Sequence, residues 1–430
     1  MEKFDIVIIG AGISGAALAY VLKNYSNAGK VAIVDKESGA AKVQSSRDNN
    51  SQTLHFGDIE TNYTLEKAKR VSAGAVYVKS YVERKESASL YEKFPKMVLG
   101  VGEEEISFLK RRFDEFKELF PNLRLIDEKE ISQIEPEVIK GRKEPVVALY
   151  SPEGYAVDYG ALTEEFIADA KAKGLKLYYD KKVKSIKELK KGYVIEAGNI
   201  SLKANFVVVA ASSNSLNFAH KLGYKRNLLL LPVGGDFFKS KGKLNGKVYM
   251  VQDPKLPFAA VHGDPAVGVK DETRYGPVAK VLPLLEKGRF LSFFDFVSLF
   301  NFKFRNFKAL FSIISDRTYF KFAVTNFLYS IPFFGKYGFA REVRKIIPSI
   351  KSSEIALARG VGGVRPQIVD SDTGKAKLGE AKIVGKNILF NITPSPGASI
   401  CLQSALEDIE QISLQTGLKF DKEKFMKDHS

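Results

Sequence analysis

Three glycines and an acidic residue near the N-terminus have the types and spacing of a dinucleotide-binding site. The glycines form Gly10-Ala-Gly12-Ile-Ser-Gly15, and Asp35 lies twenty residues after the last of them. In such a motif the first glycine allows a tight turn, the second lets the backbone approach a pyrophosphate, and the third lets a helix pack closely on a strand. The carboxylate of Asp35 would accept hydrogen bonds from a ribose, and its charge disfavours a 2′-phosphate. This pattern predicts binding of FAD or NAD rather than NADP.

The elements that must position these residues lie on either side of the glycines. Residues 5–9 are a short apolar run typical of a buried parallel strand, residues 13–22 follow a helical pattern, and residues 31–34 are a second apolar run ending at Asp35. The first turn of the helix would offer free N–H groups to phosphates. A strand-to-helix turn in an unrelated α/β protein is the alternative. Strand, helix and terminal acid together favour the nucleotide site.

A polar, turn-rich segment follows at residues 45–63 and reads Ser-Ser-Arg-Asp-Asn-Asn-Ser-Gln-Thr-Leu-His-Phe-Gly-Asp-Ile-Glu-Thr-Asn-Tyr. It resembles the corresponding segment of malate:quinone oxidoreductases. Further segments similar to that family lie at residues 231–235, 251–264, 273–277, 363–367, 393–398 and 401–403. The resemblance covers nearly the whole chain, and these later segments are more specific than the glycine pattern.

The resemblance implies FAD as the cofactor and the fold of the flavin oxidases related to D-amino acid oxidase. The expected fold class is α/β with an α+β second domain: a Rossmann-like FAD-binding domain and a discontinuous substrate domain built on a mixed or antiparallel sheet. A chain of 430 residues is long enough for two such cores. We expect residues 1–75, 155–220 and 355–430 in the FAD-binding domain, and residues 76–154 and 221–354 in the substrate domain.

The resemblance also implies which residues contact the cofactor. A strand over residues 387–392 runs into Thr393-Pro-Ser-Pro-Gly397, and a helical pattern follows from about Ala398. In this fold family the N-terminus of that helix would point at the flavin N1–C2 carbonyl edge and stabilise the anionic reduced flavin. An ordinary surface helix is the alternative. This chain has Ser212 where such flavoproteins usually have glycine. The predicted cofactor-binding residues are Gly10, Gly12, Ser14, Gly15, Asp35, Ser45, Val183, Ser212, Pro396, Gly397 and Ala398.

Two arginines are candidates for binding the substrate. The resemblance implies oxidation of a small 2-hydroxy acid, L-malate above all, by removal of the hydroxyl proton and transfer of a hydride from C2 to flavin N5. Guanidinium groups bind carboxylates bidentately. Arg365 and Arg274 lie in segments that match the family, so we expect them to hold the substrate carboxylates. Each could instead be a solvated arginine among the 66 basic residues of the chain.

The chain has four histidines, and a histidine can take a hydroxyl proton near neutral pH. His262 follows an apolar run at residues 258–261, which would place it at the end of a strand facing the cavity, and we assign it as the general base. His55 lies in the loop after the dinucleotide unit, where it would contact flavin or substrate, or bond to the backbone. His220 and His429 are expected at the surface.

Composition limits the other classes of function. A single cysteine, Cys401, excludes a disulfide framework, and no histidine or cysteine cluster has the spacing of metal ligands. The polar start of the chain indicates a reduced, cytoplasmic protein without a signal peptide. The net charge of +16 favours an anionic partner such as a membrane surface, a nucleic acid or a carboxylate substrate. A nucleic acid is not expected, because no motif that binds one is recognisable.

Residues 288–345 form a basic, phenylalanine-rich segment. Between residues 290 and 339 lie 15 of the 31 phenylalanines of the chain, and Phe300, Phe304, Phe307 and Phe311 recur at helical spacing. An aromatic helix face flanked by cations suits an anionic membrane surface, from which a membrane quinone could reach the flavin. A helical lid packed on the second domain is the alternative. Because no run of about 18 apolar residues lacks a charge, we expect peripheral contact, on the cytoplasmic side of the cell membrane.

The predicted function is therefore FAD-dependent oxidation of L-malate to oxaloacetate, with electrons passed to a membrane quinone. Two alternatives stay open. A related enzyme of the same fold could act on another 2-hydroxy acid, such as L-2-hydroxyglutarate, or on an amino acid, with oxygen as the acceptor. Alternatively, the protein could bind flavin at a membrane surface without catalysing a reaction.

Overall fold

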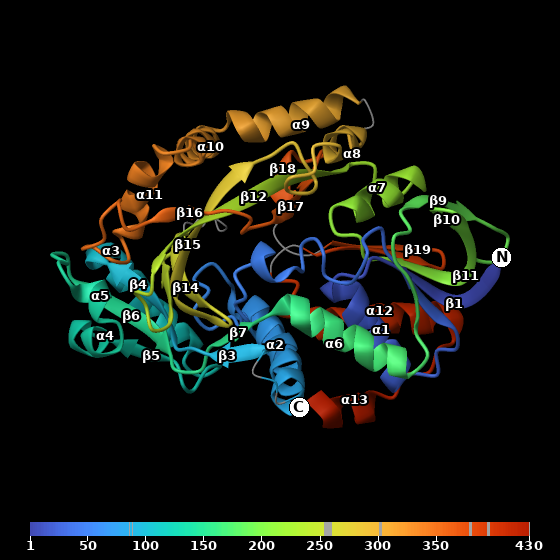
Figure 1. Cartoon of the computed structure of the whole chain (residues 1–430), viewed down its shortest axis with the longest axis horizontal. Helices are drawn as coiled ribbons and strands as arrows, with labels where there is room; N and C mark the ends of the chain where they lie inside the picture. Colours follow the sequence, from blue (N-terminus) through green and yellow to red (C-terminus); the bar gives the residue numbers. More distant parts are fainter. Residues whose placement is uncertain are drawn as a thin grey trace.

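The computed structural model describes residues 1–85, 87, 89–252, 260–300, 303–377, 381–393 and 396–429. Within these residues most strands belong to two large sheets, one of eight strands and one of ten. Figure 1 shows the eight-stranded sheet near the N-terminus and the ten-stranded sheet on the opposite side of the molecule. The expected fold class, an α/β nucleotide-binding unit joined to an α+β unit, is confirmed.

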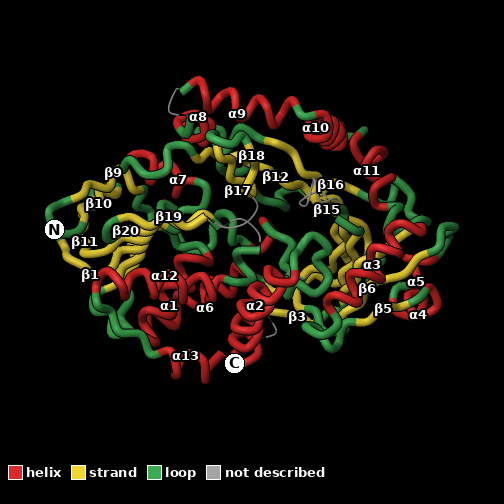
Figure 2. Tube along the Cα trace, turned by 180° about the vertical axis from the view of Figure 1, so that it is seen from behind, coloured by secondary structure: helices red, strands yellow, loops and turns green. Residues whose placement is uncertain are grey.

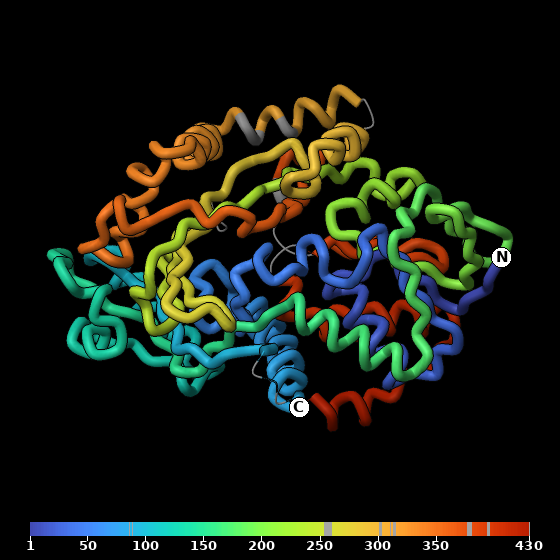
Figure 3. Tube along the Cα trace, in the orientation of Figure 1, coloured from blue at the N-terminus to red at the C-terminus, as the bar shows by residue number. Residues whose placement is uncertain are grey.

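The eight-stranded sheet has a parallel centre with the strand order β20-β11-β1-β2-β8. Neighbouring strands come from the start, the middle and the end of the chain, as the colours of Figure 3 show. β19 pairs antiparallel with β20, and β9 and β10 extend β11 in antiparallel fashion. The strands are β1 Glu2–Ile9, β2 Val31–Val34, β8 Lys176–Tyr178, β9 Val183–Glu188, β10 Tyr193–Ala197, β11 Ile200–Val209, β19 Ala381–Gly385 and β20 Ile388–Ile392.

The apolar run in β1 is continuous because both faces of the sheet are covered. Side chains alternate between the two faces of a strand. Ile6 and Ile8 join the core formed with α1, α6 and α12, whereas Val7 and Ile9 join the core formed with β9, β10 and α7. A parallel strand buried on both faces needs apolar residues at every position. The helices of this unit are α1 Ile13–Tyr25, α2 Leu65–Lys85, α6 Tyr159–Ala172, α7 Asn214–Lys221, α12 Cys401–Thr416 and α13 Lys422–His429.

The ten-stranded sheet is antiparallel except where β13 runs parallel to β4. The sequence places residues 355–430 in the FAD-binding domain, but β16 and β17 pair with β12, and β18 pairs with β17. The second unit therefore extends beyond residue 354. Its strands are β4 Lys96–Val101, β5 Arg124–Ile126, β6 Val146–Ser151, β12 Leu228–Lys241, β13 Lys247–Met250, β14 His262–Ala266, β15 Val269–Val281, β16 Ala356–Ala358, β17 Val364–Asp370 and β18 Lys375–Lys377, and a separate ribbon pairs β3 Tyr91–Lys93 with β7 Tyr155–Val157.

Four helices form a row along one edge of the molecule, visible from both sides in Figures 1 and 2. They are α8 Ser292–Ser298, α9 Phe304–Ser315, α10 Arg317–Tyr329 and α11 Gly335–Val343. α8 places Phe296 in a core shared with the first sheet, and α11 places Phe339 in the core of the second. The remaining helices are η1 Arg47–Asn49, α3 Gly102–Phe116, α4 Glu128–Ile134 and α5 Pro136–Ile139. None of the helices described here has the length and apolar character needed to span a bilayer.

Two histidines expected at the surface are buried instead. His220 lies on α7, and its Nε2 is 3.1 Å from the carbonyl oxygen of Lys225. His429 packs against the rings of Tyr20, Tyr25, Tyr81 and Phe425, with Nδ1 2.9 Å from the carbonyl oxygen of Phe425. The expectation was wrong because position near a chain end does not reveal that α13 docks against α1 and α2.

Replacing His429 with Asn should make the docking of α13 on the rest of the protein less sensitive to acid. Burial lowers the pKa of His429 from 6.5 to about 4. The unfolded segment then binds more protons than the docked one, so stability that is present above pH ~6.5 is lost as pH falls toward ~4. Hydrogen exchange of residues 422–429, corrected for intrinsic rates, should show protection falling roughly 10- to 100-fold between about pH 7 and about pH 4.5 in the parent. An equal fall in the variant would contradict the assignment.

Candidate active site

A cavity of about 350 Å³ extends from the turn after β1 to β12 and β17 of the second sheet. It begins at the carboxyl ends of β1 and β11. After β1 the chain continues into α1 on one face of the first sheet, and after β11 it continues into α7 on the other face. Open α/β sheets bind ligands at this kind of topological switch point. The cavity therefore joins the nucleotide-binding turn to the second sheet.

Close contacts explain the glycines of the turn. Gly10 has φ +115°, and a Cβ built on it would lie 2.4 Å from the carbonyl oxygen of Ala210. A Cβ on Gly15 would lie 2.1 Å from the carbonyl oxygen of Gly10. A larger residue at Gly10 would push away the chain after β11, and one at Gly15 would push α1 away from the turn after β1, because real Cβ atoms do not approach oxygen so closely. Gly15 thus acts through packing and does not line the cavity.

Asp35 and Ser45 hold the first turn of α1 in place. Asp35 Oδ2 accepts a hydrogen bond of 2.6 Å from the backbone N–H of Ala11, and Ser45 Oγ accepts one of 2.9 Å from Ile13. Burial raises the pKa of Asp35 despite these backbone donors. Both residues line the cavity, with the carboxylate at the end of β2 where a ribose would bind.

The residues around the turn fit a dinucleotide. Ser212 adopts φ +52°, the left-handed conformation that glycine usually supplies, so the serine takes the backbone conformation expected of a glycine at this position. The hydroxyl of Ser213 is buried in the cavity wall and has no hydrogen-bond partner among the described residues. A buried hydroxyl normally has a partner. An oxygen-rich ligand such as FAD would supply one.

The turn before α12 completes this wall. Pro396, Gly397 and Ala398 line the cavity, and α12 begins at Cys401 rather than near Ala398 as the pattern indicated. Pro394 and Ser395 lie outside the described residues. Of the predicted cofactor-binding residues, those that line the cavity are Gly10, Gly12, Ser14, Asp35, Ser45, Val183, Ser212, Pro396, Gly397 and Ala398.

His262 lines the cavity at the start of β14. Its Nε2 lies 3.1 Å from Asp264 Oδ2, and its ring stacks on Tyr249 with centroids 4.8 Å apart. Lys247, also buried, lies 3.5 Å from Asp264 Oδ1. Burial opposes ionisation of Asp264, but Lys247 and His262 outweigh it and lower the pKa of the carboxyl. Of the apolar run expected before His262, residues 258 and 259 lie outside the described residues.

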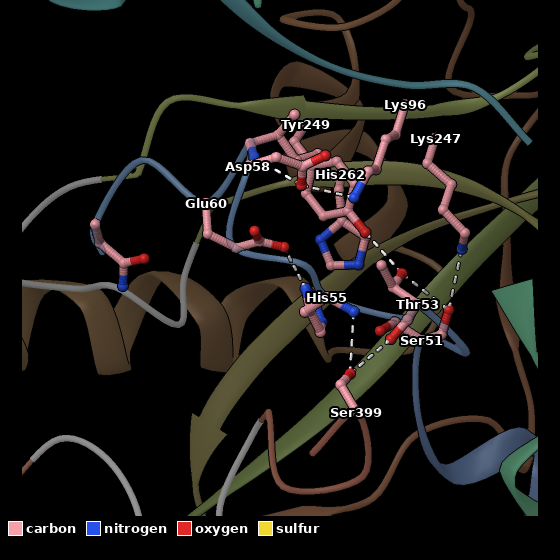
Figure 4. Close-up of polar contacts among 12 residues, drawn as sticks. Ser51, Thr53, His55, Asp58, Glu60, Lys96, Lys247, Tyr249, His262 and Ser399 are labelled. Carbon is pink, nitrogen blue, oxygen red and sulfur yellow. Dashed lines mark hydrogen bonds and ion pairs between the residues drawn. The ribbon is translucent and has the colours of Figure 1, made fainter. Parts of the chain in front are cut away.

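His55 reaches the same cavity from the loop between η1 and α2. Its Nδ1 lies 2.6 Å from Glu60 Oε1, and its backbone N–H donates to Ser399 Oγ over 3.0 Å. Figure 4 shows His55 between Glu60 and Ser399, with His262 nearby. Two imidazoles, each beside a buried carboxylate, therefore face one cavity.

Arg365 brings a cation to the cavity from β17, opposite Val233 of β12. Gln44 Oε1 accepts a hydrogen bond of 3.1 Å from the N–H of Val364 and so anchors this end of the strand. Burial lowers the pKa of Arg365. In the part of the chain that the structure describes, no aspartate or glutamate forms an ion pair with it. A half-buried guanidinium in a cavity, without an acid partner, is suited to an anionic ligand.

Arg274 lies elsewhere, outside the lining of the cavity. Its guanidinium group forms ion pairs with Asp48, at 3.1 Å, and Glu272, at 3.2 Å. Both acids already compensate its charge. The expectation that Arg274 holds a substrate carboxylate has no support in this geometry, because membership of a matching segment does not reveal which face of β15 a side chain occupies.

Sequence reasoning missed the two carboxylates beside the histidines. Asp264 follows His262 by two residues on a strand, and such neighbours share a face, so this pair had a readable signal. Glu60 follows His55 by five residues in an irregular loop, where no periodicity relates them. Only the folded loop brings that pair together.

Solved structures of low sequence identity share this fold. L-α-glycerophosphate oxidase from Mycoplasma pneumoniae superimposes with a TM-score of 0.70 at 18% identity, covering 96% of this chain and 95% of its own. Glycine oxidase from Geobacillus kaustophilus has a TM-score of 0.67 at 16% identity, covering 99% of this chain and 98% of its own. At these identities the comparison establishes the fold.

Closer relatives establish the family. The sequence model of the malate:quinone oxidoreductase (Mqo) family matches residues 2–427. The malate:quinone oxidoreductase of Helicobacter pylori is 41% identical, over 100% of this chain and 98% of its own length. A probable malate:quinone oxidoreductase of Campylobacter jejuni is 39% identical, over 99% of this chain and 98% of its own. The predicted resemblance is thus confirmed, and the chain belongs to the malate:quinone oxidoreductase family.

Proposed function

We propose that the protein uses FAD to oxidise L-malate to oxaloacetate and passes the electrons to a membrane quinone. The observation that carries this proposal is Arg365, a half-buried guanidinium without an acid partner among the described residues, in the cavity of a chain that belongs to the malate:quinone oxidoreductase family. FAD, when bound, supplies the acceptor for the hydride that leaves C2 of malate. The turn around Gly10, with Asp35 and Ser213, would hold the cofactor.

Arg365 would bind and orient one substrate carboxylate. Its planar group offers two parallel N–H donors, and the low dielectric of a buried site strengthens that contact. Its charge also selects an acid over a neutral alcohol. One of the two cavity histidines, His55 or His262, would take the hydroxyl proton, because an imidazole can hold a proton at neutral pH.

The row of helices α8 to α11 supports a peripheral membrane contact. Of the 20 large apolar side chains exposed among the described residues, 15 lie between residues 290 and 337. On α9, Phe304 and Phe311 are 82% and 72% exposed, while Asn306 is buried. On α10, Phe327 is exposed and Asn326 is buried. Helices at a water surface show the opposite arrangement.

Charge on the same row favours an anionic bilayer. Exposed basic residues lie along α9 and α10 and just before them, namely Lys303, Arg305, Lys308, Arg317 and Lys321. Aromatic rings would enter the headgroup boundary while these cations approach phosphates. We propose that this row docks the protein on the cytoplasmic side of the cell membrane, where a quinone dissolved in the bilayer can reach the flavin.

Adding L-malate to the anaerobic holoenzyme should bleach the flavin absorbance within the turnover time. Reduced flavin should then be reoxidised by a ubiquinone analogue. L-2-hydroxyglutarate and amino acids should reduce it far more slowly, because the family to which the chain belongs is named for malate. Faster reduction by one of these alternatives would show that the substrate is not malate.

Replacing Arg365 with Lys should weaken malate binding by roughly 10- to 100-fold, because a point charge replaces a bidentate contact of about 1.5–3 kcal/mol. The measurement is the malate dependence of anaerobic flavin reduction at equal FAD content. Arg274→Lys is the matched control, since Arg274 lies outside the cavity lining. A larger loss for the Arg274 variant than for the Arg365 variant would reverse the assignment.

Replacing Phe304 and Phe311 with Glu should release the protein from anionic vesicles and slow quinone reduction, with no cost to folding, because both rings are exposed. Reduction of a soluble dye by malate should continue. Leu414→Glu with Val384→Glu provides the control, because these residues are exposed outside the helix row. Persistent sedimentation with vesicles, or equal loss of dye and quinone activity, would refute the membrane contact.

A further inference from the structure

The two cavity histidines differ in whether a ligand can reach one of their ring nitrogens. Nε2 of His262 is buried and makes no hydrogen bond among the described residues, although Asp264 Oδ2 lies 3.1 Å away. Nδ1 lies 3.4 Å from the carbonyl oxygen of Ala260. The ring is further held between Tyr249 and Phe237, with centroids 4.8 and 6.1 Å away. A ligand therefore cannot reach Nε2 of His262, because that atom is buried, and Nδ1 already has a carbonyl oxygen as its partner. A ring in this position is poorly placed to receive a proton from a ligand.

His55 has the complementary arrangement. Its Nδ1 lies 2.6 Å from Glu60 Oε1, and no partner for Nε2 is found among the described residues. When Nδ1–H donates to a carboxylate, the lone pair of the neutral ring lies on Nε2. The His55 side chain lines the cavity with 18% of its surface exposed. Nε2 is thus the ring atom available to a substrate hydroxyl.

Surrounding groups keep Glu60 charged. Burial opposes ionisation, but the hydrogen bond from His55 and the charges of His55 and Lys96 outweigh it and hold the pKa of Glu60 below its ordinary value. Arg112 Nη2 donates to the carbonyl oxygen of Glu60 over 2.7 Å. Lys96 Nζ in turn lies 2.7 Å from Asp58 Oδ1. An anion at this position stabilises the imidazolium that forms when His55 takes a proton.

Hydrogen bonds also fix the backbone of His55. Ser399 Oγ accepts from its N–H, and the same hydroxyl lies 3.1 Å from the hydroxyl of Tyr159. Tyr159 OH donates to the carbonyl oxygen of Thr53 over 3.0 Å. These contacts join the loop, α6 and the turn before α12, as Figure 4 shows in part. The ring therefore has a fixed anchor as well as a fixed tautomer.

We propose that His55 Nε2 accepts the hydroxyl proton of the 2-hydroxy acid, and that Glu60 is the positioning residue that sets the tautomer and orientation of His55. The proposal rests on the proposed function, which supplies the flavin as oxidant. The O–H bond breaks with its proton passing to Nε2, the C2–H electron pair leaves as hydride to the flavin, and the C2–O bond becomes a carbonyl. His262, paired with Asp264, then serves as a wall of the substrate cavity.

The test compares two matched pairs of holoenzyme variants. In one, His55→Gln removes the base and Glu60→Gln removes its charged partner; in the other, His262→Gln and Asp264→Asn do the same for the second histidine. Anaerobic stopped-flow measures flavin reduction by malate against pH at equal FAD content. His55→Gln should slow reduction by about 10²- to 10⁴-fold. His262→Gln should slow it by less than about tenfold.

The pH profile reports the positioning role. Glu60→Gln should slow reduction by at least about tenfold and move the acid limb of the profile to lower pH, because losing the anion disfavours the protonated ring. Asp264→Asn should leave that limb in place. Added imidazole should restore part of the rate to a His55→Gly variant. Large losses and a shifted limb in the His262 and Asp264 variants, with His55 and Glu60 variants close to the parent, would overturn the proposal.

A readout independent of activity is available because the chain has only four histidines. Ring nitrogen NMR of histidine-labelled protein, assigned with His55→Gln, should show the neutral His55 ring as the Nδ1–H tautomer in the parent and the loss of that preference in Glu60→Gln. A tautomer that Glu60→Gln leaves unchanged would contradict the proposal even if this variant impaired catalysis through folding. Failure of malate to reduce the parent flavin would instead refute the proposed function, so the two failures are distinguishable.

Discussion

The close packing at the end of β1 is the constraint on which the rest of the site depends. The carbonyl oxygen of Gly10 occupies the space of a Cβ on Gly15, and the carbonyl oxygen of Ala210 occupies that of a Cβ on Gly10. α1 and the loop after β11 can meet the strand only because both side chains are absent. This contact brings together the start and the middle of the chain. The final segment joins them through β20, which pairs with β11, and the three segments form the nucleotide end of the cavity.

The distribution of buried charge separates structural from functional groups. Lys96 faces Asp58, Lys247 faces Asp264, and Arg274 faces Asp48 and Glu272, so each of these cations has its counter-charge within the fold. Burying a charge without a partner is costly. Arg365 departs from this arrangement among the described residues, and a substrate carboxylate would complete it. Accessibility separates the two cavity histidines, since Nε2 of His262 is buried beside Asp264, whereas the His55 ring lines the cavity and its Nε2 has no partner among the described residues.

Local signals in the sequence predicted the nucleotide-binding unit well. The glycines, the apolar run of β1 and Asp35 act within one short stretch, and the family resemblance extended the prediction to the fold and the cofactor. Contacts between segments that lie far apart in the sequence could not be predicted from these local signals. Strand alternation does not reveal that β16 and β17 pair with β12, nor that His429 docks against Tyr20 and Tyr81. The roles of Arg274 and Glu60 follow from the direction in which each side chain points in the folded protein. The pattern of residue types does not indicate that direction.

A crystal structure of the holoenzyme with a short dicarboxylate inhibitor such as tartronate would test the central claim most directly. The account predicts one carboxylate in bidentate contact with Arg365 and the C2 oxygen within hydrogen-bond distance of His55 Nε2, roughly 2.6–3.2 Å. A carboxylate bound to Arg274, or a C2 oxygen that contacts His262 while His55 Nε2 faces away, would contradict it.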